Sequence, residues 1–153
     1  MSSQQSHLEI MEKSFKFNAN ELNQNYLLSR SHEEANEIFA KPSTRRGRSY
    51  EEILKTVLYG HVAEVFLIEK MGFTDDTRKY KDVINTAGKY VEVKVTEGDY
   101  YVPYVLERAV AAKKESWRKY PDLLYIFIGD KKTGDYSLHG IYEWNGKNFI
   151  LQN

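Results

Sequence analysis

The sequence lacks cysteine altogether, has only three prolines among 153 residues, and carries no net formal charge, because 22 basic side chains balance 22 acidic ones. The absence of cysteine excludes disulfides and thiolate zinc sites and is typical of a reducing cytoplasm. Charge balance argues against a wholly basic nucleic-acid binder and against an acidic disordered chain. No apolar run approaches the roughly 18 residues of a membrane span, so we expect neither a transmembrane helix nor a signal peptide. We therefore expect a cytoplasmic protein, in the host cell if a phage encodes it.

Hydrophobic residues at 41% and aromatic residues at 14% are enough to build the core of a single domain. The charges are unevenly distributed, since residues 1–40 carry three basic and six acidic side chains and residues 41–153 carry 19 and 16. Residues 41–48 hold four cations, with a proline and a glycine that favour an exposed loop over a helix. We expect a helical N-terminal extension over 1–48, with two short helices in 7–39 and this basic loop, followed by a core over 49–153.

The core shows clearer patterns of secondary structure. Ser49 and Glu52 form a capping box at the start of a helix expected over 50–71, which Gly72 ends. Alternation predicts a hairpin of strands 80–84 and 90–96, a helix runs over 105–119 after Pro103, and a continuous apolar run over 123–128 predicts a central strand. Strands 136–144 and 149–151 flank Asn145-Gly146, the dipeptide of a tight hairpin turn. The fold class is α/β (α+β), a mixed sheet flanked by helices.

One carboxylate lies on the apolar side of the long helix. Glu64 falls on a stripe of residues spaced alternately by four and three, namely Ile53, Val57, Gly60, Leu67 and Met71. A buried carboxylate is costly unless it is paired, hydrogen-bonded or bound to a cation. Glu64 either reaches solvent or a lysine from the edge of the stripe, or holds a metal ion. His61, one turn away, is either an accessory ligand or a structural residue.

The predicted hairpin gathers further charge on one face. In the strand over 90–96, three valines share one face, and Glu92 and Lys94 lie on the other, where they form either a solvated pair or part of a site. A symmetric hairpin centred on Ala87 places Asp82 across from Glu92, with carboxylates roughly 5 Å apart. Such a pair repels unless a cation lies between them, and Mg²⁺ commonly binds to one or two carboxylates. A register slip of one residue would turn Asp82 to the opposite face.

These residues resemble the PD-(D/E)XK nuclease superfamily. The order of features over residues 52–130 is the same as in that family. An acidic residue on a helix comes first, followed by Asp82, by Glu92-Val93-Lys94 on the next strand, and then by a helix and a buried strand. The resemblance implies a restriction-endonuclease-like core, with Asp82, Glu92 and Glu64 as ligands of Mg²⁺ or Mn²⁺ and Lys94 as the catalytic lysine. The proline that names the motif is replaced by Lys81, and residues 1–49 match nothing in the family pattern.

The resemblance implies a metal-dependent DNA endonuclease of restriction, homing, repair or junction-resolving type. The alternative is a catalytically inactive, nuclease-like domain that binds nucleic acid or a protein partner. Candidate DNA contacts are cations in the basic loop and on the helix over 105–119: Arg45, Arg46, Arg48, Lys113 and Lys114. The last two equally suit a solvated helix face. Because a chain of this size has one active site, cutting both strands favours a homodimer or a higher homo-oligomer.

Overall fold

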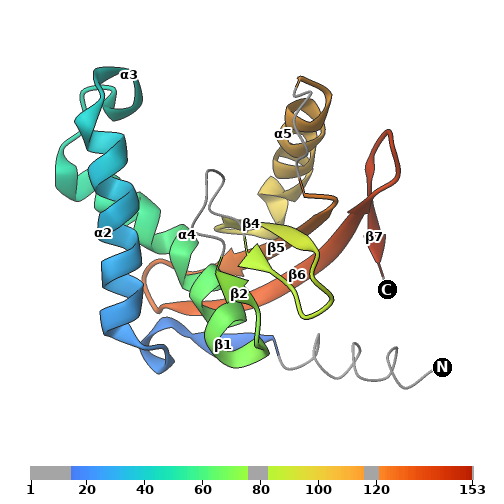
Figure 1. Ribbon diagram of the computed structural model, residues 1–153, viewed down its shortest axis with the longest axis horizontal. Coiled ribbons are helices and arrows are strands. Elements are labelled where there is room, and N and C mark those ends of the chain that lie inside the picture. Colours follow the sequence, from blue (N-terminus) through green and yellow to red (C-terminus); the bar gives the residue numbers. More distant parts are fainter. Residues whose placement is uncertain (1–14, 76–82, 116–120, 153) are drawn as a thin grey trace.

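The computed structural model describes residues 15–75, 83–115 and 121–152, which build a mixed sheet between two layers of helices (Figure 1). The strand order is β1-β6-β5-β4-β3-β2, and β7 also pairs with β6. Among the strands that the structure describes, only β4 and β5 run parallel. The strands are β1 (Lys16–Asn18), β2 (Thr74–Asp75), β3 (Val83–Ile84), β4 (Tyr90–Thr96), β5 (Leu123–Gly129), β6 (Asp135–Trp144) and β7 (Phe149–Gln152). The predicted mixed α+β class is confirmed, and β5 is the central strand expected from its apolar run.

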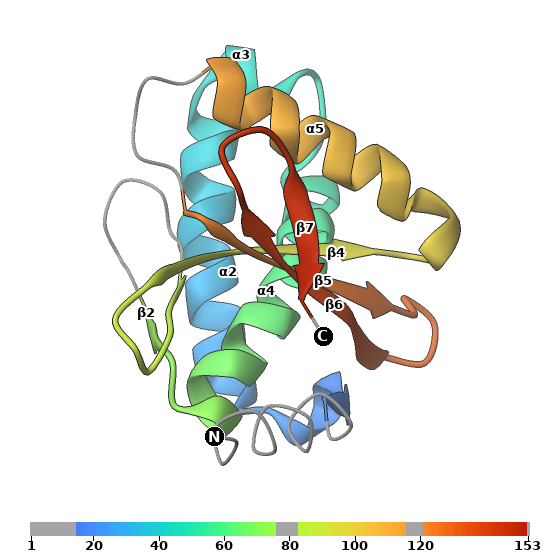
Figure 2. The same cartoon turned by 90° about the vertical axis from the view of Figure 1, so that its right-hand side faces the viewer.

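Helices cover both faces of the sheet. They are α2 (Gln24–Ala40), α3 (Pro42–Arg45), α4 (Tyr50–Met71) and α5 (Val102–Glu115), with 3-10 turns η1 (Ala19–Glu21) and η2 (Asp99–Tyr101). In Figures 1 and 2, α2 runs beside α4 on one side of the sheet and α5 lies on the other side. None of these helices, within the part of the chain that the structure describes, is long and apolar enough to span a membrane.

Helix α4 begins and ends where the sequence predicts. The Ser49 side chain accepts a hydrogen bond from the Glu52 backbone, the Glu52 side chain accepts one from the Ser49 backbone, and Gly72 ends the helix with a φ of 75°. Such a positive φ suits glycine, which has no Cβ to clash. Two separate faces of the helix are buried, because Phe66 packs in the core beneath the sheet while Ile53 and Val57 pack against α2. Helix α4 is therefore the middle layer between α2 and the sheet.

Strand alternation divides the core into two halves. Tyr125 and Phe127 of β5 join the cluster on the α4 side, together with Val91 of β4. Leu124 and Ile126 point the other way and pack with α5. The valine face of β4 is thus the face toward α4, as its alternating pattern predicts.

The predicted hairpin register is confirmed where the structure describes it. Val83 pairs with Val91 and Ile84 with Tyr90, so the pairing is centred on residue 87. Asp82 and the first residues of the expected strand lie outside the described residues, as do residues 116–119 of the expected helix over 105–119. Strand β2 was not expected, and it extends the sheet beyond β3.

The expected pair of short helices over 7–39 is wrong in the described part. Phe15 and Phe17, two residues apart, are both buried, and β1 adds an edge strand to β6. One continuous helix, α2, follows. The asparagines that suggested interruptions cap helices instead, since the Asn18 side chain caps η1 and the Asn23 side chain caps α2.

The basic segment is not wholly a loop. Pro42 occupies the first position of α3, where its missing N–H costs nothing, and thereby starts the helix it was expected to prevent. Helix α3 ends at Arg45, its C-cap Arg46 adopts a left-handed conformation with a φ of 53°, and Gly47 follows with a φ of 73°. The segment is a single exposed helical turn between α2 and α4.

Candidate active site

A cavity of about 410 Å³ lies between α2, α4 and the edge of β4. Three of the residues predicted for a nuclease site line it, namely Glu64 from α4 and Glu92 and Lys94 from β4. Arg48, one of the predicted DNA contacts, also lines it. Segments that are about 30 residues apart along the chain therefore meet at one concave site. Its lining combines carboxylates with cations.

The cavity reaches β4 through an open strand edge. Four consecutive residues of β4, residues 92–95, line it. Side chains of a strand alternate between faces, so consecutive residues reach one cavity only where the edge of the strand is accessible. Among the described residues, β3 pairs with Tyr90 and Val91 alone and leaves this edge of β4 without a partner from Glu92 onward. Glu92 and Lys94 thus meet the cavity although they lie on the opposite face of β4 from the valines.

Glu92 and Lys94 form an ion pair of 3.2 Å between Oε1 and Nζ. Their side chains are 23% and 49% exposed. At this exposure an ion pair contributes little to stability, because water screens both charges. Both side chains remain partly exposed to solvent.

Glu64 is the more deeply placed carboxylate. Its side chain is 16% exposed, and its Oε1 accepts a hydrogen bond from Nη1 of Arg30, whose own side chain is 8% exposed. The Arg30 guanidinium also binds Asp75 through two donors, Nε to Oδ2 at 3.0 Å and Nη2 to Oδ1 at 2.9 Å. Tyr26 donates a further hydrogen bond of 2.7 Å to Asp75. The unexpected carboxylate on the apolar stripe is thus paired with an arginine from α2.

His61 completes this buried network. Its Nδ1 lies 3.0 Å from Nη1 of Arg30, and its Nε2 lies 3.1 Å from Oε1 of Glu34. Arginine only donates, so Nδ1 accepts and Nε2 carries the hydrogen that is donated to Glu34. With both ring nitrogens engaged, the structural role of His61 fits the geometry and leaves no free nitrogen for a metal ion.

Electrostatics distinguish the two carboxylates that Arg30 binds. Burial raises the pKa of Glu64, and the attraction of Arg30 offsets this only in part. Burial also raises the pKa of Asp75, but hydrogen bonds from Arg30 and Tyr26 outweigh it and hold that pKa below its ordinary value. Burial, reinforced by the hydrogen bond to Asp75, raises the pKa of Tyr26 to about 12. Burial would lower the pKa of Arg30, but its two carboxylates raise it instead, so the guanidinium stays charged.

The donors in the cavity suit a hard divalent cation. Mg²⁺ prefers oxygen ligands, commonly takes one or two carboxylates and keeps several waters. Glu64 and Glu92 supply such oxygens, while the described residues contain no cluster of three or more acidic or histidine side chains that could enclose a metal ion by themselves. Asp82, the third predicted ligand, lies outside the described residues. The cavity therefore offers two of the predicted ligands, Glu64 and Glu92, and the described residues do not by themselves enclose a metal ion.

The other predicted DNA contacts lie in two places. Arg45 lies over the Phe39 ring at 5.0 Å, Arg46 is exposed at the end of α3, and Arg48 donates hydrogen bonds to the carbonyls of Thr44 and Arg45. Of these three arginines, Arg48 lines the cavity and the other two do not. Each guanidinium has further donors, so these contacts do not exhaust its capacity to bind phosphate.

The two lysines of α5 lie on the other side of the sheet. Lys113 forms an ion pair of 2.7 Å with Asp122 and lies over the Trp144 ring at 5.5 Å, so it is already partnered. Lys114 is exposed at the end of α5. Neither lysine lines the cavity. The structure thus does not bring this pair together with Glu64 and Glu92.

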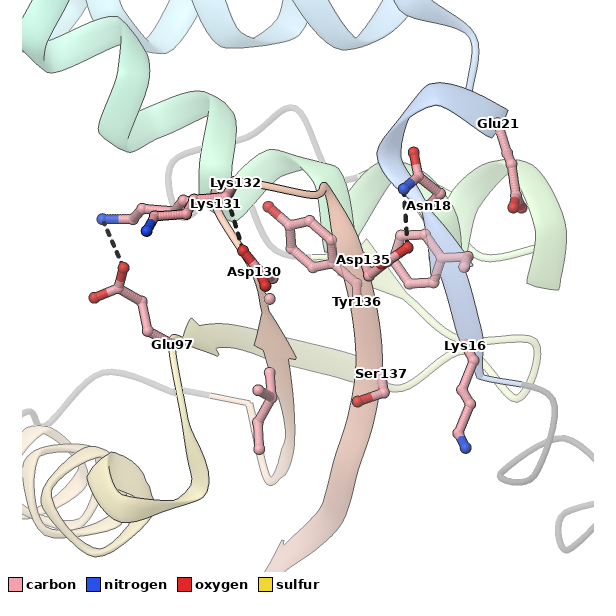
Figure 3. Close-up of a pocket in the computed structure, with 13 residues that line it drawn as sticks. Lys16, Asn18, Glu21, Glu97, Asp130, Lys131, Lys132, Asp135, Tyr136 and Ser137 are labelled. Atoms are coloured by element: carbon pink, nitrogen blue, oxygen red, sulfur yellow. Dashed lines mark hydrogen bonds and ion pairs between the residues drawn. The ribbon is translucent and has the colours of Figure 1, made fainter.

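A larger hollow of about 1050 Å³ lies where β1, the β5–β6 turn and the residue after β4 meet (Figure 3). Some of its polar groups bind one another, since Glu97 pairs with Lys131 at 3.7 Å and Asp135 accepts a hydrogen bond of 2.9 Å from Asn18. The carboxylate of Asp130 accepts hydrogen bonds from the backbone of its own turn. The hollow shares no lining residue with the cavity at β4. Glu64, Glu92 and Lys94 do not line it.

Sequence reasoning missed Arg30, which shapes the site most strongly. Its partners Glu64 and Asp75 lie 34 and 45 residues away, beyond the reach of any local pattern. One signal was present. Arg30 is the only lysine or arginine between Lys16 and Lys41, and Glu64, as a carboxylate on an apolar stripe, needs a positively charged partner.

Comparisons with known proteins identify no relative of this chain. No protein-family model, curated protein or solved structure matches the chain.

Proposed function

We propose that the chain is a metal-dependent endonuclease with a restriction-endonuclease-like core that hydrolyses phosphodiester bonds in DNA. The observation that carries the proposal is the single cavity lined by Glu64, Glu92 and Lys94. The pattern that suggested a nuclease comprises few residues, so their meeting from separate elements at one concave site is its main support.

The order of elements supports the same proposal. Helix α4 is followed by the hairpin of β3 and β4, then by α5 and the buried strand β5. This is the succession of helix acid, hairpin, helix and buried strand on which the family resemblance rests. The pairing of Val83 with Val91 agrees with the register from which Asp82 was inferred to be a ligand beside Glu92.

The proposed chemistry divides into four roles. Asp82, Glu92 and Glu64 hold Mg²⁺, which when bound stabilises negative charge on the attacking and leaving oxygens of the phosphodiester. Lys94, whose amine lies 3.2 Å from Glu92, orients the attacking water and offsets phosphate charge.

Arg48 in the cavity wall, with Arg45 and Arg46 close to it in the sequence, binds the DNA backbone. Two copies of the chain provide the two active sites that cutting both strands requires.

The experiment is cleavage of supercoiled plasmid by the purified chain with Mg²⁺, with Mn²⁺ and with EDTA. We expect nicking or linearisation with either metal, none with EDTA, and at least about a hundredfold slower cleavage for Glu92→Gln and for Lys94→Met. Glu51→Gln and Lys55→Met are matched controls, because both side chains are exposed on α4 and neither lines the cavity. Undiminished cleavage by the first two variants would refute the proposal.

The second candidate function is binding of DNA without cleavage. One observation favours it, because Glu64 and Glu92 each already pair with a cation of the chain, Arg30 and Lys94. Under this reading Mn²⁺ leaves the melting temperature unchanged, and DNA binding persists in EDTA. A rise in melting temperature with Mn²⁺ that Glu92→Gln abolishes decides for the nuclease.

A further inference from the structure

The Arg30 guanidinium is fixed in direction. Two of its donors, Nε and Nη2, bind the two carboxylate oxygens of Asp75 at 3.0 and 2.9 Å. Such a two-point bond between planar groups sets orientation as well as distance. The remaining nitrogen, Nη1, then points to Glu64 and to Nδ1 of His61. Asp75 in β2 thus aims Arg30, which lies in α2, at Glu64 in α4.

Glu64 is held at one oxygen only. Its Oε1 binds Arg30 and lies 4.0 Å from Nε2 of His61, whereas its Oε2 has no hydrogen bond or ion pair with any residue in 15–75, 83–115 or 121–152. Glu64 lines the cavity and Arg30 does not. Arg30 therefore binds Glu64 from outside the cavity lining, and Oε2 of Glu64 is left for a ligand in the cavity.

We propose that Arg30 is a positioning residue for the metal site, holding Glu64 so that its free oxygen is directed at a divalent cation in the cavity. The inference rests on the proposed function. The sequence assigned α2 to an extension outside the nuclease core. This inference makes α2 part of the metal centre. Outer-shell groups that hold a metal-binding carboxylate orient it before the ion arrives.

His61 and Glu34 hold the arginine from the other side. Nδ1 of His61 accepts from Arg30, and Nε2 of His61 donates to Glu34 on the next turn of α2. Arg30 and Glu34 are four residues apart and thus lie on the same face of α2. Arg30 is consequently braced by Asp75 on one side and by His61 on the other.

The test is a double-mutant cycle on the full chain, with Mn²⁺ as the probe and affinity measured by calorimetry and by electron paramagnetic resonance. Arg30→Lys keeps the charge and removes the two-point geometry, and Glu64→Gln removes the ligand. We expect Arg30→Lys to bind Mn²⁺ about tenfold more weakly, as outer-shell changes commonly do, and Glu64→Gln to bind it at least as weakly because the ligand itself is lost. The double variant should bind no more weakly than Glu64→Gln, because Arg30 acts through Glu64.

Arg108→Lys is the matched control, since Arg108 is an exposed arginine of α5 that binds only Tyr104 among the described residues. It should bind Mn²⁺ like the wild type. Asp75→Asn provides a second route if Arg30→Lys does not fold, because it removes the anchor of Arg30 and retains the guanidinium. It should weaken Mn²⁺ binding in the wild-type background and leave the affinity of Glu64→Gln unchanged.

The outcomes separate the two proposals. Losses that add in the double variant, or an Arg30→Lys chain with wild-type affinity, overturn the positioning role while the nuclease proposal stands. Mn²⁺ binding that needs neither Glu92 nor Glu64, or no binding by the wild type, overturns both.

Discussion

Glu64 shows how one residue can be anomalous in the sequence and satisfied in the structure. A carboxylate on an apolar stripe calls for a cation, and the fold supplies Arg30 from a helix that packs alongside. Buried ion pairs of this kind seldom add net stability, because removing both charges from water costs about as much as their attraction returns. Breaking one is costly all the same, since it leaves the other charge buried and alone. The network therefore constrains arrangement more than it adds stability.

The two carboxylates on Arg30 respond to pH in opposite directions. The pKa of Asp75 lies below 3.8, so its stabilising contribution is present above that value and is lost as the pH falls through the folded-state pKa. The pKa of Glu64 lies above 4.5, so ionising it in the folded chain costs stability, and that cost disappears as the pH falls through its raised pKa toward 4.5. One guanidinium thus faces one carboxylate that favours the ionised form and one that resists it.

We predict that Asp75→Asn lowers the free energy of unfolding most at pH 6 to 7 and progressively less below about pH 4, because the protonated wild type loses the same interaction. Urea unfolding between pH 7 and pH 2.5 measures the difference. Asp99→Asn, at an exposed position in η2, is the control and should track the wild type at every pH. A constant gap between Asp75→Asn and the wild type across this range would contradict the prediction.

At the scale of elements, local chemistry was enough wherever an element carries its own boundary signals. Helix α4 has a capping box at Ser49 and a left-handed glycine at Gly72, and both ends were predicted to the residue. Strands β4 and β5 follow from strict alternation and from a short continuous apolar run. The hairpin register followed from the symmetry of its short turn.

The sequence predictions were wrong or incomplete where tertiary packing determines the local structure. Residues 24–40 have weak helical patterning, yet they form one helix because Leu27, Ser31 and Ala35 are buried. Strand β1 is three residues long and gains its stability from pairing with β6. The pairing of Arg30 with Glu64 depends on how α2 lies on α4, which no local signal encodes. Glu92 and Lys94, by contrast, were predictable as neighbours because a strand places them two residues apart on one face.

The capping box at Ser49 makes a test at this scale. Ser49→Ala should lower the free energy of unfolding by about 1 kcal/mol, because the amide of Glu52 loses its acceptor at the start of α4, and Ser49→Gly should cost only a few tenths. Urea unfolding followed by circular dichroism measures both. Ser43→Ala is the matched control, an exposed serine in α3 that caps no helix. Equal stability of Ser49→Ala and the wild type would mean that the cap does not hold this helix end.

For the whole molecule, the N-terminal segment is continuous with the rest of the fold. Phe17 stacks on Phe66 of α4 with ring centroids 3.9 Å apart, and β1 joins the same sheet as β4 and β5. Leu22 and Leu27 enter the core cluster that α4 shares with the sheet. The packing of the described residues therefore shows no division at residue 48.

A fragment of residues 49–153 should therefore fail to fold cooperatively. It lacks the rings of Phe15 and Phe17, each of which costs about 3–5 kcal/mol when removed from a core, and it exposes Ile53 and Val57, which pack against α2, at a further cost of about 1.5–3 kcal/mol each. The total stability of a domain this size is about 5–15 kcal/mol, so these losses together consume it. Urea titration with near-ultraviolet circular dichroism should show a sigmoidal transition for the full chain and none for the fragment. A cooperative transition in the fragment with Mn²⁺ affinity matching the full chain would show instead that α2 is dispensable, and that the metal site belongs to the later residues alone.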